Sequence, residues 1–373
     1  MKILKKIIAV FLILLVLSIA GIASAAYFYE EEIKVLVVES LNKNLKTEIK
    51  VSQVDFSVFQ DFPQASVVFS NVVIYAVNAK NDTLLSAKKL RAKLSLLDLY
   101  HQQYNLIGFS AEDGKCQMIV DNSGRSNYIF WNSADSSNSN VSVQLNNISF
   151  TNMKYTYVDY SKSIGIDFLI ENAQFDGNFK EDLFDLDLTT TLKRANIQVG
   201  EMNVLENRTL FLKVKGNVDQ IVEKLNFFSS NIGIDGMNIN LNGALTYGEK
   251  SRMDLQLASE NADLKRVIAL LPPTIRSNLN RFEIIGEARL AGSISGTISS
   301  ISAPFYDFDF SVNNGTFNDT KSDIQFKSAA LSGKITNGAD RSLQTTKLEL
   351  DYFETKTSEG SVSGKLSIVN FNI

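Results

Sequence analysis

The stretch "FDLDLTTTLK", residues 184–193, alternates apolar and polar side chains, and this pattern decides the fold class of the chain. In an extended strand the apolar residues share one face, and they are Phe184, Leu186, Leu188 and Leu192. The polar residues take the other face, and they are Asp185, Asp187, Thr189 and Lys193. One dry face and one wet face in each strand predict an antiparallel sheet that is covered on one side only.

The same alternation returns along the chain. "RTLFLKVKGNVD", residues 208–219, sets Leu210, Leu212 and Val214 against Lys213 and Lys215. "TKLELDYFET", residues 346–355, repeats the pattern with Leu348 and Leu350. Turn signals rich in Gly, Asn and Asp separate these runs, so the chain is expected to be mainly β.

Helical patterns are scarce. "NADLKRVIALL", residues 261–271, predicts a helix with Asn261 as N-cap, ended by Pro272-Pro273. Its apolar stripe consists of Leu264, Val267, Ile268 and Leu271. A shorter helix is predicted over residues 274–282, and a short helical piece over residues 95–104.

The N-terminal segment predicts a membrane anchor. After the basic "MKILKK", no charged residue occurs from Ile7 to Tyr29, and Glu30 follows directly. As a helix this segment would be about 35 Å long, enough for a bilayer core of roughly 30 Å. The lysines place the N-terminus in the cytoplasm and the body of the protein across the membrane. The anchor residues that we single out are Ile7, Phe11, Leu14, Leu17 and Tyr27.

A cleaved signal peptide is the alternative to this anchor, because "ASAA" at residues 23–26 is typical of a cleavage site. The apolar run is longer than the usual signal core of about 7–15 residues, so we favour an uncleaved anchor. Both alternatives export the body of the protein.

Two elements are predicted to follow the anchor. Apolar residues at helical spacing predict an amphipathic helix over residues 31–45. "FQDFPQASVVFSNVVIYA", residues 59–76, predicts a strand that begins at Phe62-Pro63 and is apolar on both faces. Strict alternation puts Val67, Phe69 and Val73 on one face and Val68, Val72 and Ile74 on the other. We expect the helix over residues 31–45 to cover the second face.

Composition excludes several classes of function. The net charge of −4 argues against a nucleic-acid-binding surface. His101 is the only histidine, which argues against a Ser-His-Asp triad or a multi-histidine metal site. Cys116 is the only cysteine and is expected to be a half-buried structural residue. The carboxylate pairs on the strands fit a solvated face, so we expect no enzyme activity, metal or cofactor.

A series of strands with one dry face needs something to bury that face. A second sheet, giving a sandwich or barrel, is the ordinary solution, and composition alone favours it. The other solution is a long curved sheet whose dry face forms an open trough.

The order of motifs resembles the AsmA-like family of envelope proteins. The motifs are "TEIKVSQVDFSVFQDFPQASVVFSNVVI" (47–74), "DTLLSAKKLRAKLSLLDLY" (82–100) and "FSAEDGKCQMIVDNSGRSNYIFW" (109–131), followed by "ASENADLKRVIALLP" (258–272), "GEARLAGSISGTISS" (286–300) and "SAPFYDFDFSVNNGTF" (302–317). The residues that match the family's N-terminal motifs are Phe62, Pro63, Asp121, Gly124, Asn127 and Tyr128. Tyr128 stands where the family commonly has Trp.

This resemblance implies an inner-membrane protein of bacteria with a single span, a cytoplasmic N-terminus and a periplasmic body. It implies a long twisted β-sheet, curved into an open apolar groove with few short capping helices, that binds or channels phospholipid. It also implies that the protein has partner proteins that act in outer-membrane assembly or in lipid export. The expected groove residues are Phe184, Leu186, Leu188, Leu210, Leu212, Val214, Leu348 and Leu350. A periplasmic scaffold that carries no lipid remains the alternative.

On this basis we expect four regions: an anchor (1–30), a helix-capped β region (31–132), a central β-groove (133–260) and a helical hairpin followed by further groove strands (261–373). AsmA-like chains are often much longer, so a continuation beyond Ile373 is left open.

Overall fold

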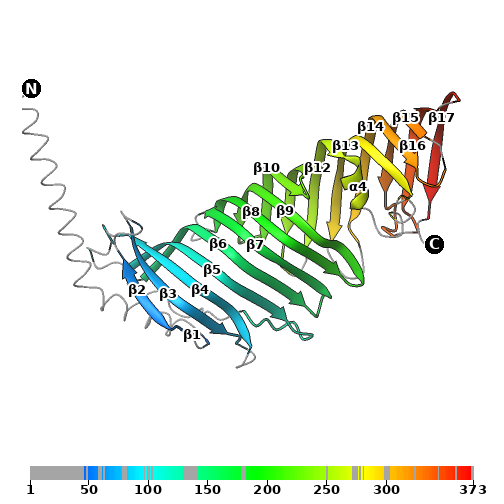
Figure 1. Ribbon diagram of the computed structural model, residues 1–373. Helices are drawn as coiled ribbons and strands as arrows, with labels where there is room; N and C mark the ends of the chain where they lie inside the picture. Colours follow the sequence, from blue (N-terminus) through cyan, green and yellow to red (C-terminus); the bar gives the residue numbers. More distant parts are fainter. Residues whose placement is uncertain are drawn as a thin grey trace, which may run out of the picture. The chain divides into compact units, whose positions relative to one another are not determined.

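The computed structural model describes residues 46–47, 49–57, 61, 64–77, 82–95, 97–98, 101, 104–128, 141–177, 182–248, 251–270, 276, 279, 281–297, 303–322, 325–342, 344–357 and 359–370 (Figure 1). The predicted anchor over residues 1–30, the helix over residues 31–45 and Phe62-Pro63 lie outside these residues. Among the described residues, no helix combines the length and the hydropathy needed to cross a bilayer.

The described residues are mainly β, and their 17 strands belong to one sheet. The pairings for which a register is given are antiparallel, apart from the parallel pair of β5 with β6. In the described part of the chain, no strand pairing closes this sheet into a barrel and no second sheet covers it. The sandwich or barrel that composition alone favours is therefore wrong, and the sheet is open.

The chain divides into two compact units. The first holds the described residues within 1–161 and 170–180, and the second those within 162–169 and 181–373. The strand β7 (Ile164–Gly177) contributes residues to both units. The four predicted region boundaries stay predictions.

The first unit contains β1 (Ile49–Lys50), β2 (Gln53–Ser57), β3 (Gln64–Tyr75), β4 (Thr83–Ser95), β5 (Tyr104–Val120) and β6 (Val141–Asp159). Its core is centred on β3, where Val67 and Phe69 are buried together with Val72 and Ile74. The four residues share one face, which corrects the predicted division of this strand.

Asn71 is the reason for the difference. Its φ of 51° lies in the left-handed region, and Ser70 and Asn71 both turn away from the core between Phe69 and Val72. One extra outward residue changes the alternation, so residues three apart point inward. Val68 and Val73 remain on the other face and are half-buried.

The same interruption is repeated across the first unit. The strand registers place Asn71 beside Lys88, Lys88 beside Asp113, and Asp113 beside Asn152. Asp113 and Asn152 also have positive φ, at 53° and 52°, and Asn152 Nδ2 donates to Asp113 Oδ1 at 2.6 Å. Asn and Asp tolerate this conformation better than other residues with side chains, which explains their place in this row.

A turn after β5 reverses the direction of the chain, and Ser126 pairs antiparallel with Val120 of β5. After β5, the carboxylate of Asp121 accepts hydrogen bonds from Ser123 N at 2.8 Å and Arg125 N at 3.0 Å, and Gly124 has a φ of 81°. The buried Asn127 side chain then binds the backbone of β5 and completes its edge: it accepts from Ile119 N at 2.8 Å and donates to Gln117 O at 3.1 Å. Tyr128 packs against the core of this unit.

The second unit contains β8 (Leu183–Val199), β9 (Met202–Asp219), β10 (Lys224–Ile234), β11 (Met237–Thr246), β12 (Arg252–Asp263), β13 (Phe282–Thr297), β14 (Phe305–Asp319), β15 (Gln325–Thr336), β16 (Lys347–Lys356) and β17 (Ser361–Val369). Each strand pairs antiparallel with the next. Helix α4 (Leu264–Ala269) connects β12 to the segment before β13.

Helix α4 confirms the predicted helix and corrects its cap. Asp263, not Asn261, is the N-cap, because β12 pairs as far as Asp263 and the Asp263 carboxylate accepts from Arg266 N at 3.0 Å. Leu264, Val267 and Ile268 pack together as predicted. The second predicted helix is wrong at Phe282, which begins β13, and residues 271–275 with Leu271 and Pro272-Pro273 lie outside the described residues.

Candidate functional site

The strand registers of the second unit join the predicted groove residues on one face. Leu188 of β8 stands opposite Val214 of β9, Phe184 opposite Val218, and Thr190 opposite Leu212. Residues directly opposite one another in an antiparallel pair share a face. The predicted residues of these two strands therefore form one apolar surface.

This surface continues from strand to strand. Opposite pairs are Leu212 with Ile232, Ile232 with Ile239, Leu241 with Leu257, Leu255 with Ile294, Ile294 with Tyr306, Phe308 with Ile335, Ile335 with Leu348, and Leu348 with Ile368. We call this surface, from β8 to β17, the apolar face. All eight predicted groove residues lie on it, including Leu210 opposite Leu192, and Leu350 opposite Leu366.

Burial on the apolar face is uneven. Phe184, Leu186 and Val214 are buried, at 8%, 6% and 7% exposure. The other predicted residues, which are Leu188, Leu210, Leu212, Leu348 and Leu350, are half-buried. On β17, Leu366 and Ile368 are 49% and 39% exposed. Much of the apolar face thus keeps partial access to solvent.

The opposite face is polar. Lys215 Nζ lies 3.3 Å from Asp187 Oδ2, and Lys334 Nζ lies 2.9 Å from Asp307 Oδ2. Asp187 and Asp307 therefore lie on the polar side of the sheet, each with a lysine of the neighbouring strand. A shallow depression of about 490 Å³ lies mostly on this face, with Ala258 and Ala291 among its lining residues and Asn240 and Asp309 beside them.

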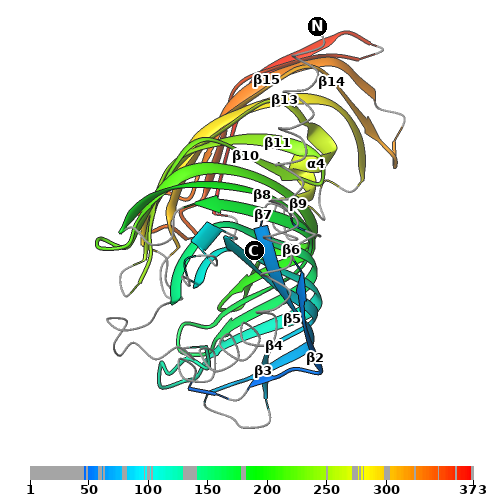
Figure 2. The same ribbon diagram turned by 90° about the vertical axis from the view of Figure 1, so that its left-hand side faces the viewer.

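Helix α4 covers one margin of the apolar face. In Figure 2 the strands β10–β13 are strongly bent, and α4 lies on the inner side of the bend. Leu264 packs there with Met237, Ile284, Ala288 and Val312, which are all 9% exposed or less. Since these residues belong to the face that carries Leu290 and Leu331, the apolar face is the inner one.

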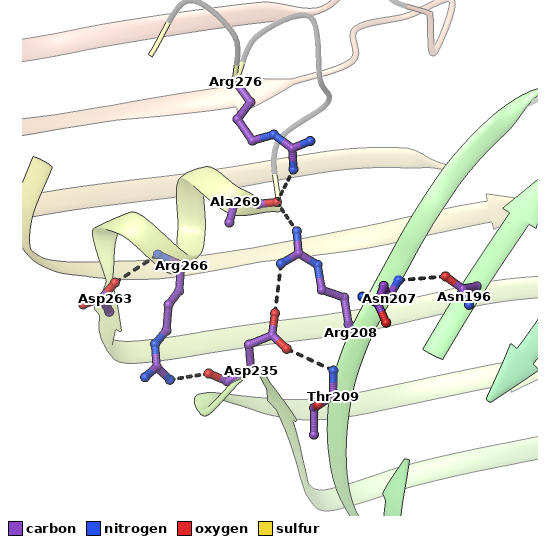
Figure 3. Close-up of polar contacts among 9 residues, drawn as sticks. All are labelled: Asn196, Asn207, Arg208, Thr209, Asp235, Asp263, Arg266, Ala269 and Arg276. Atoms are coloured by element: carbon purple, nitrogen blue, oxygen red, sulfur yellow. Dashed lines mark hydrogen bonds and ion pairs between the residues drawn. The ribbon is translucent and has the colours of Figure 1, made fainter. Parts of the chain in front are cut away.

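A polar cluster fixes the C-terminal end of α4 at this margin (Figure 3). Arg208 Nη1 lies 2.9 Å from Asp235 Oδ2, and Arg208 Nη2 donates to the carbonyl oxygen of Ala269, the last residue of α4. Arg276 Nη1 donates to the same carbonyl oxygen at 3.1 Å. The exposed carbonyls at a helix end need such donors.

A second set of contacts fixes the turn between β10 and β11. Asp235 Oδ1 accepts from Thr209 N at 2.9 Å, and Arg266 Nη1 donates to the backbone oxygen of Asp235. Gly236 follows with a φ of 84°, and a Cβ there would meet the Arg266 guanidinium. Glycine at this position therefore lets the α4 side chain reach the turn.

Sequence reasoning missed this cluster. Its members come from β9, the β10–β11 turn, α4 and Arg276, and no local pattern links them. The one available signal is Arg208 itself, a positive charge two residues before Leu210, on the inward side of β9 opposite the buried Ala195.

Burial keeps some titratable side chains of the described residues protonated. Burial raises the pKa of Cys116 to about 11, so its thiol stays protonated at neutral pH. Within the described ranges, no three His, Cys, Asp or Glu side chains are placed to hold a metal ion. Burial also raises the pKa of Tyr155 to about 12.

Comparison with protein-family models finds no match to this chain. Comparisons with curated proteins and with solved structures find no match either. The resemblance to AsmA-like proteins stays a prediction.

Proposed function

We propose that the chain is an AsmA-like envelope protein that binds or channels phospholipid along the apolar face and thereby supports outer-membrane biogenesis. Residues 7–29 anchor it in the inner membrane with a cytoplasmic N-terminus, and the body lies in the periplasm. Acyl chains occupy the inner side of the second unit, where a second layer of protein would otherwise be needed.

The apolar face is the observation that carries this proposal. Apolar residues pair across every strand from β8 to β17, and many of them are only half-buried. Transfer of a methylene from water to an apolar surface is favourable by about 0.8 kcal/mol, so an acyl chain on this face removes apolar area from water on both partners. Such a continuous, partly exposed surface marks a binding site.

Site-specific crosslinking tests the proposal. A photo-crosslinking residue such as p-benzoyl-phenylalanine is placed at Leu212 or at Lys213, neighbours on β9 with opposite faces, in the full chain in cells labelled with radioactive phosphate. We expect labelled phospholipid on the protein with the probe at Leu212 and little with the probe at Lys213. Equal or absent labelling at the two positions contradicts the proposal.

Charge placed on either face gives a second test. Leu188→Asp puts a carboxylate on the apolar face, whereas the matched control Thr189→Asp puts it on the polar face opposite Lys213. We expect Leu188→Asp to reduce the phospholipid that co-purifies and Thr189→Asp to leave it unchanged. If the folded wild-type chain carries no lipid, the scaffold alternative takes its place.

A further inference from the structure

Three guanidinium groups gather at the margin of the apolar face that α4 covers. Arg208 comes from β9, Arg266 from α4, and Arg276 from the segment that follows α4 (Figure 3). Arg208 donates to Asp235 and to the Ala269 carbonyl, and Arg276 donates to that same carbonyl. One backbone oxygen thus holds two arginines close together.

Arg208 is paired with a carboxylate, that of Asp235. Asp263, the other aspartate labelled in Figure 3, accepts from the backbone N of Arg266 at 3.0 Å and caps α4. The guanidinium groups of Arg266 and Arg276 donate to backbone oxygens, which carry no net charge. The three arginines and two aspartates drawn in Figure 3 carry a net formal charge of +1.

The position of the cluster matches an amphipathic ligand. Arg208 points to the same side of β9 as Leu210, since the two are separated by one residue and stand opposite Ala195 and Leu192. The first turn of α4 buries Leu264 against the apolar face. The positively charged side chain of Arg208 therefore lies at the margin of the apolar face, two residues from Leu210.

We propose that Arg208, Arg266 and Arg276 form a binding site for the phosphate group of a phospholipid whose acyl chains lie on the apolar face. This inference rests on the function proposed above. A phosphate oxygen carries charge and accepts a stronger hydrogen bond than a neutral carbonyl, so it competes for the arginines that the Ala269 carbonyl now holds. A planar guanidinium group can donate two parallel hydrogen bonds to two oxygens of the same phosphate group.

Binding of short-chain lipids to the purified full chain in detergent tests the site. The probes are dihexanoyl phosphatidylglycerol, the corresponding diacylglycerol without phosphate, and inorganic phosphate. The variant is Arg276→Gln, with Arg276→Lys as the conservative change. The matched control is Arg289→Gln, which removes an equal charge from an exposed residue. In the wild type, Arg289 Nε lies 3.0 Å from Glu260 Oε2.

We expect Arg276→Gln to weaken phosphatidylglycerol binding by about tenfold or more, the usual effect of losing a hydrogen bond to a charged group. Diacylglycerol binding should not change, Arg276→Lys should recover part of the loss, and Arg289→Gln should bind as the wild type does. An unchanged melting temperature of the Gln variant shows that the loss is local.

Other outcomes separate the two proposals. If wild type and Arg276→Gln bind phosphatidylglycerol and diacylglycerol equally well, the phosphate site is overturned while the lipid-binding face stands. If inorganic phosphate binds as tightly as the lipid, the site takes free phosphate and the head-group assignment is overturned. If neither lipid binds the wild type, the proposed function itself fails.

Discussion

Arg208 and Asp235, 27 positions apart in the chain, form an ion pair with 2.9 Å between Nη1 and Oδ2. The pair joins β9 to the turn between β10 and β11, and through the Ala269 carbonyl it also holds the end of α4. The Arg208 side chain therefore connects β9, the turn between β10 and β11, and the C-terminal end of α4.

Asp235→Ala should destabilise the second unit. The change leaves Thr209 N and the Arg208 guanidinium without their acceptor, and we expect a loss of about 1–2 kcal/mol of unfolding free energy. Urea denaturation measures it. Asp235→Asn keeps one amide oxygen as acceptor and should lose less; an equal loss in the two variants contradicts the role given to the carboxylate oxygens.

Leu264→Ala should loosen α4 from the apolar face. Leu264 is 8% exposed and packs in the cluster with Ile284 and Val312, so removal of its side chain should cost about 2–4 kcal/mol. The exposed neighbour Lys265 serves as control, and Lys265→Ala should stay within about 0.5 kcal/mol of the wild type. Similar stability of the two variants would mean that α4 does not pack on this face in solution.

Asp319 should make stability depend on pH in the acid range. Hydrogen bonding from Arg281 lowers the pKa of Asp319 from 3.8 to about 2. Since the folded pKa lies below the unfolded one, the stabilisation is complete above pH 3.8 and is lost as the pH falls through about 2. Urea denaturation between pH 2 and 7 should therefore show the difference between wild type and Asp319→Asn shrinking only below about pH 4. A difference that is constant with pH contradicts this assignment.

Asn127→Ala should destabilise the first unit. Asn127 is 7% exposed, and its amide serves both Ile119 N and Gln117 O, so alanine leaves two backbone groups of β5 without partners. We expect a loss of about 1–3 kcal/mol in thermal or urea denaturation. The exposed Asn122 in the same turn provides the control, because Asn122→Ala should have little effect.

Asn71→Val should also destabilise the first unit. A β-branched residue is strained at the φ of 51° found here, and we expect a cost of about 1–2 kcal/mol. Asn71→Gly should be tolerated, and Ser70→Val, the same bulk one position earlier, is the matched control. Stability of Asn71→Val equal to that of the control would argue that β3 continues without an interruption.

The sequence predicts the apolar face well because strand alternation is a local property. Between interruptions the period of two holds, so Phe184, Leu186 and Leu188 could be placed on one face from ten residues of sequence. Their common face with Leu212 and with Leu348 follows once the strands pair in order. The division of β3 failed because a single residue at positive φ shifts every later side chain.

Other features of the fold depend on contacts that a short stretch of sequence does not reveal. The parallel pairing of β5 with β6 does not follow from the alternation of either strand, and after the turn at Asp121 the chain first runs antiparallel beside β5 at Asn127. The Arg208–Ala269 contact joins residues 61 positions apart. The N-cap differs by two residues from the predicted Asn261, because pairing with β13 extends β12 to Asp263.

The interruptions of the strands also decide whether the inward side chains belong to residues with odd or with even numbers. In β3 the inward residues carry odd numbers up to Phe69 and even numbers from Val72; in β14 they are even up to Val312 and odd from Gly315. Insertion or deletion of one residue within a strand therefore exchanges the two faces of everything beyond it, whereas exchange of one apolar residue for another leaves the face intact. Strand length to the nearest residue is thus under stricter constraint in this protein than the identity of the side chains it presents.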